Sequence, residues 1–330
     1  MNFGIACNRC NEIFNQPKRC QLSECSYPAY FEDIRRRFGN NIPPKYYISL
    51  IGGINAGKTI YLLSLLDIIN SRDEALRNLL KKYAIRSFEI IDKVSWELYD
   101  KIMERYKLGA DFGTLPTSPL GSFNIILTLE NGQAYELVMF NTSGEKIEHA
   151  FTSRKVTGAH ELQGAAFIYF LDPREDKGIN KLLSSPKGLS PANYNMTDYL
   201  HNVMQVVNKG VQIVRNPLAI CISKFDLLKH RIPFDLPEAT YVEAGRDNFF
   251  LAIDKVSQKL EIFLKKESKA VNVNDVKEKF HSHKYFTVAP FGKDTKPAYW
   301  HDKDPKGILA PFFWLLKELQ LITESHGNYK

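Results

Sequence analysis

The chain has 330 residues, of which 44% are hydrophobic and 25% charged, so it can bury a sizeable core and does not have the composition of a disordered chain. Its formal net charge of +7 permits a nucleic-acid partner, but such an excess is also common on ordinary solvated surfaces. The longest apolar run, Ala165–Leu171, is far shorter than the ~18 residues of a membrane span, and the first residues do not form a signal peptide, so we expect a cytoplasmic protein.

Four of the five cysteines lie near the start of the chain, at Cys7, Cys10, Cys20 and Cys25. Their spacing, C-x2-C followed by C-x4-C, is typical of a closed tetrahedral Zn²⁺ site, and the reducing cytosol favours metal over disulfides. A unit of ~30 residues buries too little surface to fold alone, so the metal would stabilise it. We predict a zinc-ribbon knob over residues 1–35, with free thiols or a redox pair as alternatives. Zinc ribbons can contact nucleic acid or protein.

Strand and helix patterns then alternate along the chain. Buried strands are predicted at Tyr46–Ile51, Phe123–Leu129, Ala134–Phe140, Ala165–Leu171, Leu218–Ile222 and Tyr285–Val288. Helices are predicted at Thr59–Ile69, about 197–208, 243–266 and Ile308–Ile322. Apolar residues at helical spacing indicate a helical insertion at about 71–108, and they are Phe88, Ile91, Val94, Leu98 and Ile102. The expected fold class is α/β, with a mostly parallel sheet covered by helices on both faces, over residues 45–330.

The stretch LIGGINAGKT combines a strand end, a glycine-rich turn and a helix start. It matches G-x-x-x-x-G-K-[ST], the phosphate-binding loop, in the strand–loop–helix context that makes this motif specific. Backbone N–H groups can wrap a polyphosphate, Lys58 would reach the β- and γ-phosphates, and the Thr59 hydroxyl would bind Mg²⁺. The predicted phosphate-binding residues are Gly53, Ile54, Asn55, Ala56, Gly57, Lys58 and Thr59.

The segment Leu218–Leu228 reads as a buried strand ending in Ser223, Lys224, Phe225 and Asp226. With this motif, the chain resembles the TRAFAC-class P-loop GTPases, whose guanine-reading motif is [NT]-K-x-D. The resemblance implies that the Asp226 carboxylate accepts hydrogen bonds from guanine N1–H and N2–H, which adenine cannot offer. It also implies that the Lys224 stem packs on the base. A surface KxD motif after a strand, and hence an ATPase, is the alternative.

The resemblance continues through the rest of the domain. Asn141 stands where the family has the Asp of D-x-x-G, which implies Mg²⁺ contact through water but without the negative charge. Gly144 would contact the γ-phosphate, and Glu145 takes the place of a water-orienting Gln. Ala289 and Pro290 occupy the position of the last guanine-binding motif.

Two further residues are assigned through the family pattern. The switch threonine that closes on Mg²⁺ should precede the hairpin, and Thr117 is the first choice, with Thr114 second. Asn55 stands where potassium-dependent members hold K⁺ near the β/γ bridge, so K⁺-stimulated hydrolysis is a hypothesis; an asparagine that only shapes the loop is the alternative. The layout of cysteine knob and enlarged G domain loosely resembles bacterial double-GTPase-type proteins, which implies a regulatory role with a protein partner.

These patterns predict a GTP/GDP-binding switch with slow Mg²⁺-dependent hydrolysis. Water would attack the γ-phosphorus, while Lys58 and the loop amides stabilise the charge. The alternatives are a pseudo-GTPase scaffold without turnover, indicated by Asn141 and Glu145, and a nucleic-acid-binding module led by the zinc knob. Asp172, which follows the strand Ala165–Leu171, is expected to cap a helix, and an indirect contact with the base or ribose is the alternative.

Overall fold

The computed structural model describes residues 5–6, 13–14, 34–53, 56–71, 73–91, 96–97, 99–100, 103–104, 122–141, 165–183, 214–228, 248–292 and 304–323. The first two strands, β1 (Ile5–Ala6) and β2 (Ile13–Phe14), form an antiparallel pair. In the sequence, Cys7 and Cys10 lie between these two strands. All four predicted zinc ligands lie outside the described residues, so the zinc-ribbon knob stays a prediction. The described residues contain no cluster of three or more His, Cys, Asp or Glu side chains suited to a metal ion.

The centre of the fold is a seven-stranded sheet with the order β4-β5-β6-β3-β7-β8-β9. Its strands are β3 (Lys45–Gly52), β4 (Ile85–Ile90), β5 (Ser122–Leu129), β6 (Ala134–Asn141), β7 (Ala166–Leu171), β8 (Leu218–Ile222) and β9 (His283–Thr287). The pairs from β6 to β9 are parallel, whereas β4, β5 and β6 pair antiparallel. Every residue of β7 and β8 is buried, as expected for central parallel strands. The prediction of an α/β fold with a mostly parallel sheet is confirmed.

The prediction of a helical insertion over 71–108 is wrong for residues 85–90, which form strand β4. Only Glu74–Lys82 (α3) is helical in the first part of that range. Phe88 and Ile90 are buried while Ser87 and Glu89 are half-buried, which is the two-residue alternation of a strand. Antiparallel pairing with β5 supplies the backbone hydrogen bonds of this strand. The register of that pairing shifts between Ile85 and Ser87, which interrupts the alternation of buried and exposed residues and makes the strand harder to predict from the sequence.

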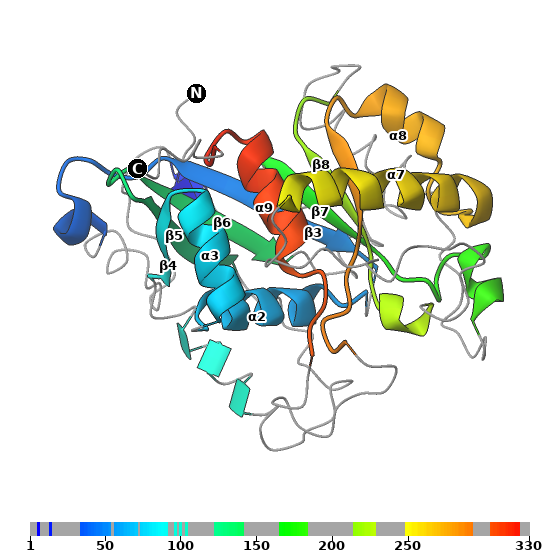
Figure 1. Ribbon diagram of the computed structural model, residues 1–330. Helices are drawn as coiled ribbons and strands as arrows, with labels where there is room; N and C mark the ends of the chain where they lie inside the picture. The colour runs from blue at the N-terminus through cyan, green and yellow to red at the C-terminus, as the bar shows by residue number, and fades with distance from the viewer. Residues whose placement is uncertain are drawn as a thin grey trace.

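The longer helices lie on one face of the sheet (Figure 1). They are α2 (Lys58–Ile69), α3, α7 (Phe249–Glu267) and α9 (Leu309–Glu318), and a short helix, α8 (Val273–Lys279), follows α7. Three of the four predicted helices are thus confirmed with altered ends, while the one at 197–208 lies outside the described residues, and α8 was not predicted. On the opposite face Tyr47, Val138 and Phe140 form a separate buried cluster. The expectation that helices cover both faces of the sheet stays a prediction for this opposite face.

Helix α9 forms the centre of the helical layer. Its residues Leu309–Leu316 are all buried. The ring of Phe312 lies 5.6 Å from Phe88 of β4, and Trp314 lies 5.7 Å from Phe286 of β9, measured between centroids. The helix therefore packs on side chains from both edge strands of the sheet and closes the core. Among the described residues, no helix combines the length and the apolar character that crossing a membrane requires.

Asp176 fastens the segment after β7 to the turn between α7 and α8. Its carboxylate is fully buried and accepts hydrogen bonds from the backbone N–H groups of Gly178 and Ile179. On the other side it accepts hydrogen bonds from the Ser268 hydroxyl and from the N–H groups of Lys269 and Ala270. Because Gly178 and Ile179 are also buried, the carboxylate satisfies N–H groups that would otherwise be costly to bury.

Replacing Asp176 by Asn should lower the free energy of unfolding by about 2 kcal/mol, because the charge is lost and the new amide N–H₂ faces several donors. The measurement is equilibrium unfolding in urea. The matched control is Asp254→Asn, which makes the same change in a carboxylate that is 48% exposed and paired with Lys284. Equal stability of the two variants would contradict the structural role of Asp176.

Candidate functional site

Those predicted nucleotide-site residues that the structure describes lie at one edge of the sheet. In the register of the parallel strands, Asn141 at the end of β6 lies opposite Leu50, and Gly52 at the end of β3 lies opposite Phe170. The ends of β7, β8 and β9 continue the row, since Leu171 pairs with Ile222 and Ile222 with Thr287. The carboxyl ends of these strands therefore form one edge. At β3 the chain changes direction across the sheet, because β4, β5 and β6 lie on one side of β3 and β7, β8 and β9 on the other. Ligands of open α/β sheets bind at such a point.

The phosphate loop leaves β3 at this edge and leads into α2. Gly57 precedes the helix with φ 91°, a left-handed conformation that favours glycine. A Cβ atom on Gly52 would lie 2.7 Å from the carbonyl oxygen of Phe170, so the loop start also requires glycine because the chains approach closely. Among the remaining loop residues, Gly53 and Ala56 are buried, and Ala56 N–H donates to the Gly53 carbonyl at 3.3 Å.

Lys58 lies folded over this loop. Its ammonium donates to the carbonyl oxygens of Gly52 at 2.7 Å and Gly53 at 2.8 Å, and the side chain is buried. A positive charge is thereby held at the loop, at the N-terminus of α2, where a polyphosphate would also receive the helix-end N–H groups. The sequence prediction for Lys58 is compatible with this position.

Asn141 and Thr59 are in direct contact although they are far apart in the chain. The Asn141 amide Nδ2 donates to Thr59 Oγ1 at 2.9 Å. The Asn141 Oδ1 atom is buried and has no hydrogen-bond partner among the described residues. A hydroxyl oxygen and an unpartnered amide oxygen are the hard donors that Mg²⁺ accepts, so these two residues fit a magnesium site. The pair brings no negative charge to it.

The loop after β8 lies between the ends of β7 and β9. Ser223 uses both its N–H and its hydroxyl to donate to the Leu171 carbonyl, at 2.9 and 3.1 Å. Lys224 adopts φ 50° and precedes the short turn η3 (Phe225–Leu227), which contains Asp226. The N–H of Phe225 donates to the carbonyl of Val288 at 3.3 Å. This last bond places the predicted base-reading loop beside the residues that follow β9.

Ala289 and Pro290, the predicted counterpart of the last guanine motif, are held in place from two sides. Ala289 exchanges backbone hydrogen bonds with Lys306, at 2.9 and 3.0 Å. The Pro290 carbonyl accepts a long hydrogen bond, 3.5 Å, from the Ser64 hydroxyl of α2. The segment is thus connected to the helix that begins at the phosphate loop.

Asp172 does not cap a helix, and that expectation is wrong. It follows β7 directly, and its buried carboxylate forms ion pairs of 2.7 Å with both Lys224 and Arg174. It also accepts the N–H of Arg174, closing the turn after the strand. Burial opposes ionisation of Asp172, but the Arg174 hydrogen bonds and the nearby charges of Lys224 and Arg174 outweigh it and lower its pKa.

Glu175 was missed by the sequence analysis, yet it lies against the phosphate loop. A Cβ atom on Gly53 would collide with the Glu175 carboxylate, 3.0 Å from Oε1. Burial, followed by the charge of Asp172, raises the pKa of Glu175 to about 7, although Lys224, Lys58 and Arg174 act in the opposite direction. The available signal was the acidic and basic run from Asp172 to Asp176, directly after a fully apolar strand.

The raised pKa of Glu175 predicts a stability change with pH. Between pH 4.5, the ordinary pKa of a glutamate, and about pH 7, Glu175 is protonated in the folded protein and ionised in the unfolded chain. The free energy of unfolding therefore falls as pH rises through this range, and the stability contributed by the protonated side chain is lost above the folded pKa. The gain in unfolding free energy from Glu175→Gln should be larger at pH 8 than at pH 5 by about 1–2 kcal/mol. Urea unfolding at both pH values measures it. Glu278→Gln on the exposed surface is the control, and a gain that is independent of pH would contradict the prediction.

The other predicted site residues lie outside the described part of the chain. They are Ile54 and Asn55 of the phosphate loop, Thr117 and its alternative Thr114, and Gly144 and Glu145 after β6. Their assigned roles in γ-phosphate sensing, K⁺ binding and water orientation stay predictions.

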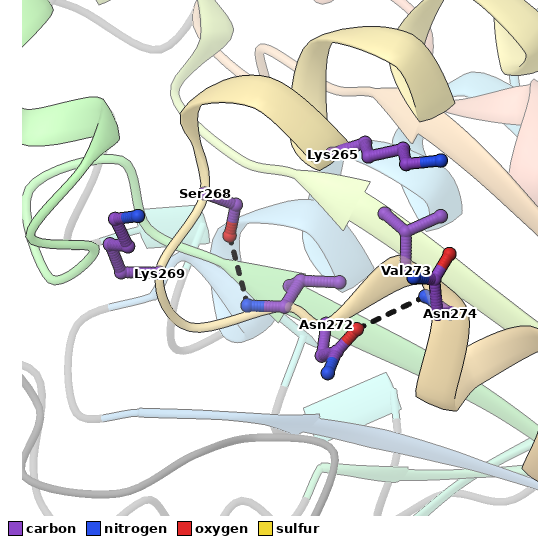
Figure 2. Close-up of a pocket in the computed structure, with 7 residues that line it drawn as sticks. Lys265, Ser268, Lys269, Asn272, Val273 and Asn274 are labelled. Atoms are coloured by element: carbon purple, nitrogen blue, oxygen red, sulfur yellow. Dashed lines mark hydrogen bonds between the residues drawn. The ribbon is translucent and has the colours of Figure 1, made fainter.

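A cavity of about 370 Å³ lies elsewhere, at the turn between α7 and α8 (Figure 2). Its lining residues are Lys265, Ser268, Lys269, Val271, Asn272, Val273 and Asn274. The polar groups shown there already form local bonds, since Ser268 Oγ accepts from Val271 N–H and Asn272 Oδ1 from Asn274 N–H. No sequence motif falls in this cavity, and we regard it as a surface hollow beside the Asp176 contact.

No family model matches the sequence, and no curated protein matches it. Among solved structures, the chain is similar to the GTP-bound GTPase-like domain of S. cerevisiae Ski7, with 16% identity, a TM-score of 0.36 and coverage of 84% of this chain. It is also similar to Methanosarcina barkeri Roco2 RocCORdC bound to GDP, with 13% identity, a TM-score of 0.33 and coverage of 85%. The match spans 50% of each of those chains. At these scores, function has to be inferred from the residues of the site itself.

Proposed function

We propose that this chain is a GTP-binding switch with slow Mg²⁺-dependent hydrolysis. The observation that carries the proposal is the 2.9 Å hydrogen bond between Asn141 Nδ2 and Thr59 Oγ1. It joins the phosphate loop to the strand end where the resemblance to TRAFAC-class GTPases expects the residue that contacts Mg²⁺ through water. Two motifs predicted separately from the sequence thus meet at one point of the sheet edge, which a chance glycine-rich turn would not explain.

In this proposal the phosphate groups lie over the loop and the N-terminus of α2. Lys58 would turn its ammonium from the Gly52 and Gly53 carbonyls to the β- and γ-phosphates, and loop N–H groups would stabilise the charge that develops as water attacks the γ-phosphorus. Thr59, and Asn141 through water, would hold Mg²⁺, which neutralises phosphate charge. Loss of the γ-phosphate would rearrange the segments of Thr117 and Gly144, and a partner protein would detect that change.

The base would lie at the β8 end of the same edge. Asp226 would accept two hydrogen bonds from guanine, each about 1.5–3 kcal/mol when one partner is charged, which favours guanine over adenine by roughly a hundredfold or more. Its loop is adjacent to the residues after β9, through the hydrogen bond from Phe225 N–H to the Val288 carbonyl. This adjacency supports a single base site built from both segments.

A nucleotide-binding scaffold without turnover is the second candidate function. It is favoured by Asn141, whose neutral amide donates to Thr59 and brings no charge to the magnesium site. Weak Mg²⁺ binding would slow hydrolysis without removing nucleotide affinity, because the phosphate loop and Asp226 would still make their contacts.

The deciding experiment measures nucleotide affinity and phosphate release on the full chain, with GTP and ATP, in MgCl₂ with KCl or NaCl. GTP-selective binding with slow phosphate release is expected, and Asn141→Asp should increase the release by strengthening Mg²⁺ binding. GTP-selective binding without release in either salt would identify the scaffold. Equal rates in KCl and NaCl would exclude the K⁺ role of Asn55. Absence of GTP binding at about 0.1 mM would reject the proposed function.

A further inference from the structure

We propose that Asp172 is a positioning residue for nucleotide recognition, because it fixes the ammonium of Lys224 so that the Lys224 stem forms a preformed wall of the base site. The inference rests on the proposed function and deepens it. It assigns a role in base binding to a residue that belongs to none of the predicted nucleotide motifs. The chemical class recognised by this wall is the flat face of a purine base.

Lys224 is fixed at both of its ends. Its backbone is held in a left-handed conformation with φ 50°, which an L-residue adopts only when its surroundings impose it. The Leu227 N–H donates to its carbonyl at 3.0 Å, and the preceding residue, Ser223, is bonded to the end of β7. At the other end, the ammonium donates to Asp172 Oδ2 at 2.7 Å. The methylene stem between these two points therefore has little freedom left.

Asp172 is itself rigidly placed. It follows the last residue of β7, its side chain has no exposed surface, and Arg174 binds both of its oxygens, with Nη2 2.7 Å from Oδ2 and Nε 3.1 Å from Oδ1. Arg174 N–H also donates to Oδ1 at 3.0 Å. The carboxylate thus stands at a fixed place on the sheet edge before any ligand arrives.

Preorganisation explains why this arrangement would matter for binding. A free lysine side chain has many rotamers, and a ligand that uses its stem must order them and loses affinity in doing so. Asp172 orders Lys224 in the absence of ligand, so the base meets a formed surface. The Lys224 side chain remains 26% exposed, so part of it is still accessible to a ligand.

The test compares GDP with inorganic pyrophosphate, because only GDP has a base. Asp172→Asn should lower GDP affinity about tenfold or more and leave pyrophosphate affinity within about twofold. In a Lys224→Met background, which keeps a stem but has no ammonium to fix, Asp172→Asn should change GDP affinity by less than about twofold. A role of Asp172 in the fold alone would reduce GDP affinity equally in both backgrounds and would overturn the inference. Asp254→Asn, at a surface ion pair, is the matched control.

A second pair of variants decides the matter if Asp172→Asn does not fold. Lys224→Arg retains a cation that can pair with Asp172, whereas Lys224→Met does not. GDP affinity should stay within about threefold of the wild type for the first and fall at least about tenfold for the second. Equal GDP affinity in both variants would overturn the inference.

If the unmodified chain binds GDP but Asp172→Asn binds it equally well, this inference alone fails. If the unmodified chain binds neither GDP nor pyrophosphate, the proposed function fails with it.

Discussion

Replacing Lys58 by alanine should reduce GTP affinity by about a thousandfold. The ammonium is the positive charge placed on the phosphate loop, 2.7 and 2.8 Å from its carbonyls, and in the proposed function it pairs with two phosphates. Two charge-assisted hydrogen bonds of about 1.5–3 kcal/mol each correspond to a factor of this size, since each 1.4 kcal/mol changes affinity tenfold. Calorimetric titration of GTP in MgCl₂ measures it.

Two controls separate lost binding from lost folding. Lys284→Ala removes a lysine whose partner is the surface carboxylate Asp254, and it should leave GTP affinity unchanged. Thermal unfolding of Lys58→Ala should show a folded protein, because the hydrogen bonds that it loses to the Gly52 and Gly53 carbonyls lie at the loop and not in the hydrophobic core. GTP affinity within fivefold of the wild type, in a folded Lys58→Ala variant, would show that the nucleotide does not use this loop.

Replacing Asp226 by Asn should lower GTP affinity roughly a hundredfold and create affinity for xanthosine triphosphate. The carboxylate can accept from guanine N1–H and N2–H, whereas an amide turns one of its two groups into a donor. That donor opposes the guanine amino group but matches the carbonyl that xanthine carries at the same position. The location of Asp226 in η3, beside the residues after β9, is the structural basis of this prediction.

The measurement is competition between GTP and xanthosine triphosphate for the full chain and for the variant. Asp254→Asn is again the control, because it makes the same chemical change in helix α7, at a half-exposed carboxylate paired with Lys284. If Asp226→Asn loses affinity for both nucleotides equally, the residue supports the fold of its loop and does not read the base.

The strands of the fold could be predicted from the sequence because their signals are local. Ala166–Leu171 and Leu218–Ile222 are uninterrupted apolar runs, and both are fully buried strands of the sheet. Strand β4 could not be predicted in the same way. Its apolar residues also fit helical spacing, and only the neighbouring strand β5, which is distant in the sequence, decides between the two periods.

The residues of the site also differ in whether a local sequence signal identifies them. Lys58, Thr59 and Asp226 belong to short motifs whose spacing already identifies a chemistry. Asp172 and Glu175 do not, because their importance comes from contacts across the sheet edge, with Lys224 in one case and with Gly53 in the other. A helix cap was the best local explanation of Asp172, but its ion pair with Lys224 joins the segment after β7 to the loop after β8.

The position of α9 has a consequence for how the chain acquires its structure during translation. Leu309–Leu316 is buried throughout, and its rings pack on Phe88 and Phe286, from the two edge strands. A ribosome has to deliver the residues up to Glu318 before this helix can dock. Until then the nascent sheet lacks this part of the cover on its helical face, and the apolar surface left exposed there is one that a chaperone would bind. The packing of the two edge strands against their helical cover can therefore be completed only after α9 has been synthesised.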